Sequence, residues 1–202
     1  MVILAACTGM HWSEIADLPL DRIDWKARTV TADRQLKRNA TTPIFTPPKS
    51  KAGIRTLPLP ALAVAELLLH LSQCPLGPAG PLSTTPSGTV LNQNNWRRRE
   101  WNRARMWAYG VPRDVTFHRL RHTYASLLID QGVHSKVLQV RLGHASAAET
   151  MDTYGHLYPD SDQGTRIAID TAFRVASNVA KDIACGFHHG RRNRRNRWSH
   201  GR

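Results

Sequence analysis

Apolar residues recur at helical spacing through most of this 202-residue chain. Windows in which they fall three or four positions apart predict helices. These windows cover residues 2–7, 13–18, 61–71, 95–109, 117–130, 135–142, 148–154 and 165–184. Residues 61–71 are apolar around most of the helical circumference, which predicts a buried helix. Ser13 is placed to cap the second of these helices at its N-terminus.

Strand-like patterns are confined to the stretch between residues 22 and 59. β-branched and aromatic residues are interspersed with polar ones over 22–36, and shorter runs of this kind follow at 43–45 and 54–59. A turn at 49–53 separates the last two runs. We therefore predict a small three-stranded antiparallel sheet in an otherwise helical protein, an α+β fold that is mainly α.

The predicted helix 95–109 has a face that mixes tryptophans with basic residues. Its arginines include Arg97, Arg98, Arg99 and Arg103. One interpretation is a half-buried helix that places Trp96 and Trp107 in the core and leaves the arginines in solvent. The other is direct contact of the arginines with DNA. The two are compatible, because arginines around a core-facing tryptophan can reach phosphates.

The composition points to a polyanionic partner. The chain carries a formal net charge of +13 and has a pI near 10.6, and basic surfaces concentrate phosphates around them. Residues 186–202 contain six arginines and no acidic residue. We therefore expect a disordered basic tail there, preceded by one domain formed by residues 1–185.

Cysteine usage and hydropathy favour a protein of the reducing cytoplasm. The three cysteines, Cys7, Cys74 and Cys185, have neither metal-ligand spacing nor the pattern of a disulfide framework. No apolar run is long enough to cross a membrane, and the apolar start of the chain is too short for a signal peptide. We expect no contact with a membrane.

The densest group of candidate catalytic residues follows the arginine-rich helix. His118 and Arg121 are three residues apart, so that both can point to one side of a helix. A Gly143-His144 pair comes next, and Tyr154 stands near the end of the following short helix. Imidazoles, a guanidinium and a phenol can hold a phosphodiester and attack it without a metal. We therefore expect neither a metal site nor a cofactor.

This ordered set resembles the signature of the tyrosine recombinase (phage integrase) family, in which HxxR precedes a Gly-His pair and a nucleophilic tyrosine. Residues 8–25 resemble the first conserved box of that family, and residues 47–60 resemble the hairpin that carries its catalytic lysine. The resemblance implies a tyrosine-recombinase catalytic-domain fold and double-stranded DNA as the partner. It also implies a bacterial or phage-encoded protein that associates with the nucleoid.

The resemblance assigns roles residue by residue. Tyr154 would attack the phosphorus, form a 3′-phosphotyrosyl link and release a 5′-hydroxyl, whereas Tyr158 lacks the family context. Arg121 would clamp the phosphate with two hydrogen bonds. His144 would donate to the phosphate, and His118 would donate to it or help to take the proton of the tyrosine. Three further histidines are expected to be structural: His122, His134 and His156.

The hairpin offers two lysines that could protonate the leaving 5′-oxygen. The Pro-Lys-Ser/Thr-Lys pattern of many relatives favours Lys49, whereas a gapless fit to shorter hairpins favours Lys51. We prefer Lys49 as the catalytic lysine and assign Lys51 to DNA contacts.

The first box departs from the family at one catalytic position. Family members have an arginine directly after the Thr-Gly-hydrophobic turn, one of two that clamp the scissile phosphate, and this chain has His11 there. An imidazole has fewer donors and is only partly charged near neutral pH. Glu14 matches the acidic residue that orients this arginine, although it could equally be a carboxylate that favours a helix N-terminus.

We predict site-specific DNA recombination or integration by cleavage and religation. The chain begins a few residues before the first box, so the resemblance predicts a catalytic domain that is incomplete at its N-terminus. The alternative is a catalytically impaired DNA-binding remnant of an integrase, which His11 and this start favour and the intact HxxR, Gly-His and Tyr set opposes. A type IB topoisomerase would share the chemistry but resembles these motifs less.

The predicted helix 165–184 carries an apolar stripe beyond the tyrosine. In the family such a helix often docks into a neighbouring protomer. We expect self-association on DNA through this helix, with packing on its own domain as the alternative.

Overall fold

We describe the fold from a computed structural model of the chain. The structure describes residues 1–37, 44–74, 80–158, 162, 164–167, 169–171, 173 and 174. The chain divides into two compact units, Met1–Tyr158 and Pro159–Arg202. The first unit is mainly helical with small antiparallel sheets, which confirms the predicted fold class.

The first helix, α1 (Val2–Thr8), corresponds to the predicted helix 2–7 and ends at a glycine in the left-handed conformation. Gly9 has a φ of 66°, in the left-handed region that glycine adopts without strain. A Cβ added there would lie 2.5 Å from the ring of Tyr124. The turn therefore needs glycine for its backbone and for space, and it brings the chain close to the later helix that carries Tyr124.

The second helix, α2 (Trp12–Ala16), begins one residue earlier than the pattern predicts. Its N-cap residue is His11, whose backbone N–H donates to Oε2 of Glu14 at 2.8 Å. Ser13 lies inside the helix and is buried, so its prediction as the cap was wrong. Glu14 is the reason, because its carboxylate accepts a hydrogen bond from the backbone N–H of His11 and so closes the first turn of α2 at that residue.

The three-stranded sheet is present with a different set of strands. It consists of β1 (Ile23–Asp24), β2 (Thr29–Ala32) and β5 (Arg55–Pro58), antiparallel and in the order β1-β2-β5. The strands β3 (Gln35–Leu36) and β4 (Phe45–Thr46) form a separate antiparallel pair. The predicted strand 22–36 is therefore three strands, and the predicted strand 43–45 is partly outside the described residues and pairs outside the main sheet.

A tight turn accounts for this division. Asp24 Oδ1 accepts a hydrogen bond from the N–H of Ala27 at 2.8 Å, and Arg28 has a positive φ of 51°. Side chain-to-backbone bonds of this kind favour turns over continued strands.

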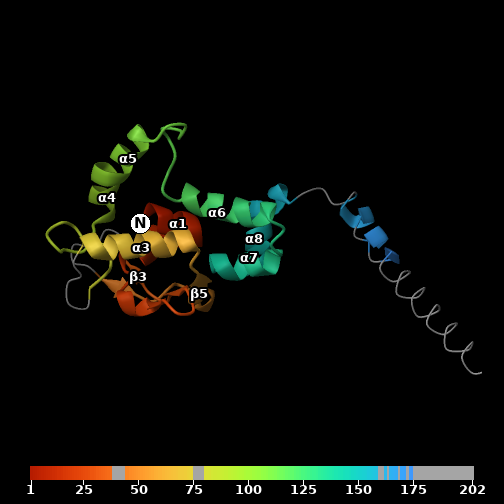
Figure 1. The fold of residues 1–202 in the computed structure, drawn as a ribbon, viewed down its shortest axis with the longest axis horizontal. Helices are drawn as coiled ribbons and strands as arrows, with labels where there is room; N and C mark the ends of the chain where they lie inside the picture. The colour runs from red at the N-terminus through yellow and green to blue at the C-terminus, as the bar shows by residue number, and fades with distance from the viewer. Residues whose placement is uncertain are drawn as a thin grey trace, which may run out of the picture. The chain divides into compact units, whose positions relative to one another are not determined.

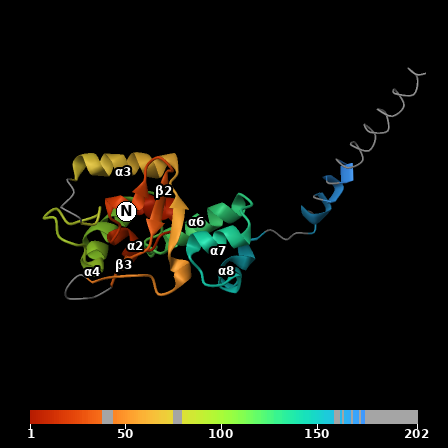
Figure 2. The ribbon, with the colours of Figure 1, turned by 90° about the horizontal axis from the view of Figure 1, so that it is seen from below.

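The helix α3 (Ala61–Gln73) lies along one side of the sheet (Figure 2). Ala63 and Leu67 pack with sheet residues in the main core. Three further leucines are 50–56% exposed: Leu62, Leu68 and Leu69. The helix was predicted correctly, but its burial on most sides was not, because only one of its faces packs on a layer of the described structure.

The predicted helix 95–109 is a continuous helical segment that stands away from the rest of the unit (Figure 1). It consists of α4 (Gln93–Trp96), a π-helical turn η3 (Arg97–Trp101) and α5 (Asn102–Trp107), and we call it the α4–α5 segment. The π turn brings residues five apart onto one face, so Trp96 stacks with buried Trp101 at a centroid distance of 6.3 Å. The expectation that Trp107 is a core residue was wrong, since it is 87% exposed.

The remaining helices of the unit form a second core. They are α6 (Arg119–Asp130), α7 (Ser135–Leu142) and α8 (Ala147–Tyr154), which match the predicted helices within two residues. Their buried residues include Ile129, Leu138 and Tyr154. Short 3-10 turns complete the unit: η1 (Leu20–Arg22), η2 (Lys51–Gly53) and η4 (Gly155–Leu157).

The second unit contains the predicted helix 165–184 and the predicted tail. Its described residues from 164 to 174 are helical. The rest of that helix, the predicted boundary at residue 185 and residues 186–202 lie outside the described residues. Within the described part of the chain, no helix is long and apolar enough to cross a membrane.

Candidate active site

Five aromatic side chains form a continuous row where α2, α6 and α8 meet. The ring centroids of His11 and His118 lie 5.6 Å apart with nearly parallel planes, and those of His118 and His122 lie 4.8 Å apart. The row continues to Tyr154 at 5.5 Å from His122 and ends at His144, 6.4 Å beyond. This histidine–tyrosine row joins four of the sequence-predicted residues to His122, for which we expected a structural role.

Arg121 is buried in the first turn of α6 and holds two helix ends together. Its Nη1 donates to the carbonyl of Gly9 at 2.7 Å, and its Nη2 donates to the carbonyl of Leu142. These carbonyls belong to the C-terminal ends of α1 and α7, where helices leave acceptors unpaired. Burial, reinforced by the charge of Arg55, lowers the pKa of Arg121 to about 10, so it stays cationic at neutral pH.

A second buried guanidinium, Arg55 on β5, was missed by the sequence interpretation. Its Nη1 and Nη2 donate to the two carboxylate oxygens of Glu14 at 2.7 and 2.9 Å, and its Nε donates to the carbonyl of Arg141 at 2.9 Å. The strand alternation does contain a signal: Arg55 and Leu57 share the inward face of β5, and a charged residue on a buried face requires a partner.

Glu14 therefore combines the two roles that the sequence left open. It lies in the first turn of α2, and it pairs with an arginine of the site, although with Arg55 in place of an arginine at position 11. Burial by itself raises the pKa of Glu14, but the hydrogen bonds and charge of Arg55 outweigh this effect and hold the pKa below its ordinary value. Glu14 is thus a carboxylate at neutral pH.

Three imidazoles of the row, His11, His122 and His144, are uncharged at neutral pH. Burial lowers the pKa of His11 to about 4, with a further contribution from the nearby Arg121. Burial followed by the charge of Arg121 also lowers the pKa of His144, and burial with the charges of Arg119 and Arg121 lowers that of His122. The histidine at position 11 therefore supplies no positive charge where the family has an arginine.

The hydroxyl of Tyr154 and Nδ1 of His122 are 2.9 Å apart. Burial raises the pKa of Tyr154, with the charge of Arg121 acting against it, so the phenol is protonated at neutral pH. A neutral imidazole at this distance can accept the proton of the phenol when its other nitrogen carries the hydrogen. The sequence did hold a clue, because His122 follows His118 by four residues and shares its helical face.

His144 lies before α8, and its ring contacts that helix. Its Nδ1 lies 2.9 Å from Oγ1 of Thr150. The preceding Gly143 has a φ of 71°, and a Cβ there would lie 3.0 Å from the carbonyl oxygen of Ala52 and 3.2 Å from Cδ of Arg55. A glycine is required at this point, and its absence of a side chain lets the lysine hairpin pass close to Gly143.

Lys49 and Lys51 lie on that hairpin, and both are exposed. Ala52, next to Lys51, touches the backbone region of Gly143. The contacts of the described residues link neither lysine to the histidine–tyrosine row. The choice between them therefore stays a prediction.

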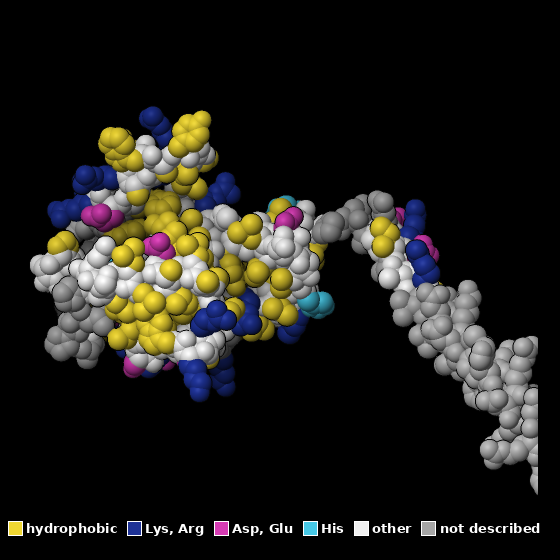
Figure 3. Space-filling view, viewed as in Figure 1, with side chains coloured by type: hydrophobic (Ala, Val, Ile, Leu, Met, Phe, Trp, Pro, Cys, Tyr) yellow, Lys and Arg dark blue, Asp and Glu magenta, His cyan; other side chains and the backbone are white. Residues whose placement is uncertain are grey.

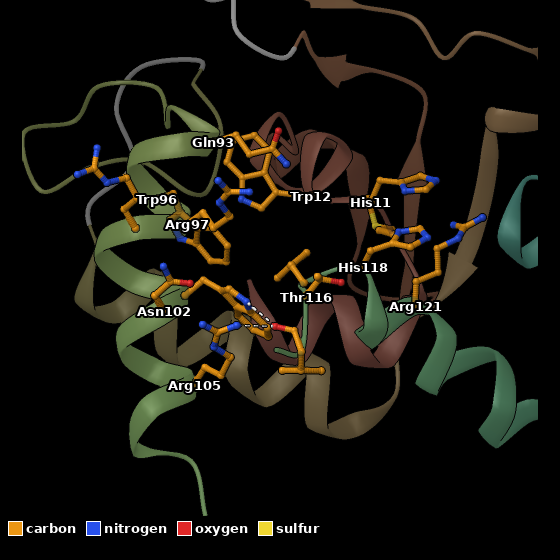
Figure 4. A pocket seen from close by; sticks show the side chains of 15 residues that line it. His11, Trp12, Gln93, Trp96, Arg97, Asn102, Arg105, Thr116, His118 and Arg121 are labelled. Carbon is orange, nitrogen blue, oxygen red and sulfur yellow. Dashed lines mark hydrogen bonds between the residues drawn. The ribbon is translucent and has the colours of Figure 1, made fainter. Parts of the chain in front are cut away.

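The arginines of the α4–α5 segment separate into two sets. Arg97 and Arg98 line a cavity of about 410 Å³ together with His11, His118 and Arg121 (Figure 4). Arg99 lines a different hollow, beside Glu100, and Arg103 is exposed. Dark blue side chains gather over this segment in Figure 3.

The remaining histidines and Tyr158 lie outside the row. His134 Nδ1 accepts a hydrogen bond from the N–H of Lys136 at 3.1 Å and so caps α7, in agreement with its predicted structural role. His156 is exposed, and Tyr158 packs beside the core of α6, α7 and α8. Among the described residues, no group of three or more His, Cys, Asp or Glu side chains is arranged to hold a metal ion.

The fold is that of tyrosine-recombinase catalytic domains. The solved structure of the Tn1549 transposon integrase in complex with circular intermediate DNA superimposes with a TM-score of 0.69 at 20% identity, covering 85% of this chain and 58% of that one. The sequence profile of the phage integrase family matches residues 1–160, and the chain belongs to this family.

Relatives in sequence include a tyrosine recombinase and a transposase. The chain is 28% identical over 183 residues to a XerC-like tyrosine recombinase of Caldanaerobacter subterraneus subsp. tengcongensis, covering 79% of this chain and 45% of that protein. It is 26% identical over 171 residues to the transposase of transposon Tn916 from Enterococcus faecalis, covering 79% and 42%. The chain therefore spans less than half the length of these two relatives.

Proposed function

We propose that this chain is the catalytic domain, residues 1–185, of a site-specific DNA recombinase that works through a 3′-phosphotyrosyl intermediate. The observation that carries the proposal is the histidine–tyrosine row, which joins His11 to Tyr154 beside the buried Arg121. Family membership and the DNA-bound Tn1549 integrase support double-stranded DNA as the partner. Arg97, Arg98, Arg99, Arg103 and Lys51 would contact its phosphates.

The proposed step exchanges one phosphoester bond for another. The oxygen of Tyr154 bonds to phosphorus, its proton passes to Nδ1 of His122, and the bond from phosphorus to the 5′-oxygen breaks. The 5′-oxygen takes a proton from the hairpin lysine, Lys49 in our preferred assignment and Lys51 in the alternative. Since Tyr154 is buried in this structure, the step requires a shift of α8 that exposes the hydroxyl to DNA.

Charge on the phosphate is compensated by donors from the start of α6 and from the turn after α7. Arg121 uses two of its five N–H donors for Gly9 and Leu142 in the described structure, and others remain for the nonbridging oxygens. His118 and His144 add further donors. Rejoining reverses the step, with a 5′-hydroxyl attacking the phosphotyrosine.

Trapping the covalent intermediate tests this proposal. Duplexes selected from a random pool by binding to the protein would be nicked next to each candidate cleavage position, so that the short cleaved strand diffuses away. We expect a covalent adduct with the unchanged protein. Tyr154→Phe removes only the attacking oxygen, so it should abolish the adduct and leave DNA affinity unchanged, while the matched control Tyr158→Phe keeps both. An adduct that persists in Tyr154→Phe would exclude this tyrosine as the nucleophile.

The neutral state of His11 favours a second candidate, a catalytically impaired DNA-binding remnant. Removing one charge-compensating donor lowers rates by roughly 10²–10³-fold, and His11 supplies no charge because its pKa lies at about 4. For an active recombinase we expect His11→Arg to raise the adduct rate by about 10²-fold. DNA affinity without any such gain would identify the remnant.

We also retain self-association on DNA through residues 165–184 and a cytoplasmic, nucleoid-associated location. Self-association is tested by counting the protomers bound to a duplex with paired sites. The count is made with the full chain and with a chain that lacks the residues after 159. An unchanged number of protomers would indicate that this helix packs on its own domain and does not mediate association.

A further inference from the structure

A cavity of about 410 Å³ adjoins the histidine–tyrosine row on the side of the α4–α5 segment. In Figure 4, Arg97, Asn102 and Arg105 extend from that segment, and His11, His118 and Arg121 stand on the opposite side. One continuous space therefore reaches from the groups proposed to hold the scissile phosphate to the basic segment. Its volume is within the range of about 300–1,000 Å³ typical of sites for small organic groups.

The wall between these two sides is aromatic. Trp12, Trp96, Trp101 and Phe117 line the cavity and contact one another. The ring centroids of Trp96 and Phe117 are 5.2 Å apart and their planes are nearly perpendicular. The π-helical turn is what places Trp96 and Trp101 on this wall. A rigid aromatic surface beside a phosphate-binding group suits a flat ring that leaves a nucleic-acid stack.

The polar groups in the cavity are mainly donors. Trp12 is only 4% exposed, and its indole N–H has no hydrogen-bond partner in the described structure. Nε of Arg105 is also buried without a partner. None of the 15 lining residues is an aspartate or glutamate. Buried donors without acceptors are costly, so the fitting ligand is flat, rich in acceptors and attached to negative charge.

We propose that this cavity takes up one unstacked nucleotide base of the DNA strand next to the scissile phosphate. Base edges present carbonyl and ring-nitrogen acceptors to the indole N–H of Trp12, and Arg97 and Arg98 meet the adjoining phosphates. The proposal rests on the proposed function, because that function brings DNA to the site. A docking helix from a second copy fits less well, since its apolar face would bury the unpaired donors and leave the arginines without anions.

Short oligonucleotides with and without bases test the proposal. The probes are a fluorescently labelled thymidine tetranucleotide and a tetramer of abasic deoxyribose phosphates with the same charge, and binding to the full chain is followed by anisotropy. Stacking of a base on aromatic side chains contributes about 1–3 kcal/mol. We therefore expect the thymidine tetramer to bind about tenfold more tightly than the abasic one.

Single-residue variants test which side chains cause the preference for the tetramer with bases. Trp96→Leu should abolish it, and Trp12→Phe, which keeps a ring but loses the N–H, should reduce it several-fold. The matched control is Trp107→Leu on the same segment, which is 87% exposed and outside the cavity, and it should retain the full preference. Circular dichroism and thermal melting confirm that each variant is folded.

Three results would overturn the proposal: equal affinity for the two tetramers, a base preference that survives Trp96→Leu, or displacement of the thymidine tetramer by a peptide of residues 165–184. The last result would assign the cavity to the helix of residues 165–184. These outcomes are separate from the adduct test with Tyr154→Phe. Adduct formation without base preference removes only the base pocket, and base preference without an adduct removes only the cleavage function.

Discussion

The histidine–tyrosine row and the α4–α5 segment hold their polar side chains in opposite ways. In and around the row, the guanidinium groups of Arg55 and Arg121 are buried and hydrogen-bonded to carboxylate and carbonyl oxygens. On the segment, the arginines are mostly exposed, and the helix is anchored by Trp96 and Trp101. Bond-breaking groups need fixed positions, whereas phosphate contacts need charge and reach.

The two regions also differ in how much of the structure is affected by a single substitution. Arg55 reaches Glu14 across 41 residues of sequence, and Arg121 reaches Gly9 across 112. Each of these side chains ties several elements together, so its loss disturbs the whole site. Charges on the exposed segment act separately, and their effects should be small and additive.

The largest expected effect comes from breaking the buried pair. Arg55→Met leaves the Glu14 carboxylate buried without its cationic partner and with only the N–H of His11 as a donor, and removing one member of such a pair costs about 3–5 kcal/mol. We expect a loss of this size in the free energy of unfolding, measured by urea denaturation. Glu14→Gln added to Arg55→Met should recover a large part of it.

Arg103→Met on the exposed segment is the matched control for this prediction, with an expected change below about 0.5 kcal/mol. Equal losses in the two single variants would show that the buried and exposed arginines do not differ in their contribution to stability. The contrast between the two regions would then be wrong for stability, where we expect the largest difference.

A second test concerns the proton acceptor in the row. His122→Gln keeps a hydrogen-bonding side chain but cannot take a proton at neutral pH, so the adduct rate should fall about 10²-fold or more with unchanged DNA affinity. Burial lowers the pKa of His122, so the neutral acceptor persists as the pH falls to the ordinary histidine value of about 6.5. The adduct rate of the unchanged protein should decline only at pH values below that.

His134→Gln is the control, because this histidine caps α7 away from the row, and it should leave the rate and its pH profile unchanged. If His122→Gln also leaves them unchanged, the tyrosine proton goes elsewhere, with His118 as the remaining candidate from the sequence.

Local sequence patterns predicted the helices that carry the histidine–tyrosine row better than they predicted which side chains contact one another there. The range of α7 was predicted to the residue and that of α8 within one residue, because periodicity and caps lie within each segment. The contacts of Arg55 with Glu14 and of His122 with Tyr154 join residues that no local pattern connects. Arg55 and His122 were therefore missed as site residues although each has the spacing of a site residue in its own element.

The α4–α5 segment shows the opposite failure. Its helix and its arginines were predicted, but the π-helical turn rotates the aromatic face from the spacing of Trp96 and Trp107 to that of Trp96 and Trp101. A π turn has no simple sequence signature, so the packing of Trp101 and the cavity behind it could not be derived from the 3.6-residue period. Similarly, the apolar composition of α3 predicted a helix but did not specify how many of its faces are covered.

The smallest expected effect concerns single arginines of the segment. Each phosphate contact that is lost lowers the dependence of log K on log salt by about 0.9 on duplex DNA. Arg97→Gln and Arg103→Gln should each reduce DNA affinity a few-fold at physiological salt, the double variant should show the sum of the two slope changes, and none should change the free energy of unfolding appreciably. Glu100→Gln in the same segment controls for charge and should strengthen binding slightly. Titrations from low to physiological salt measure these slopes. A slope that stays constant in the double variant would mean that the exposed arginines do not bind phosphates. The segment would then not differ from the histidine–tyrosine row by supplying phosphate contacts.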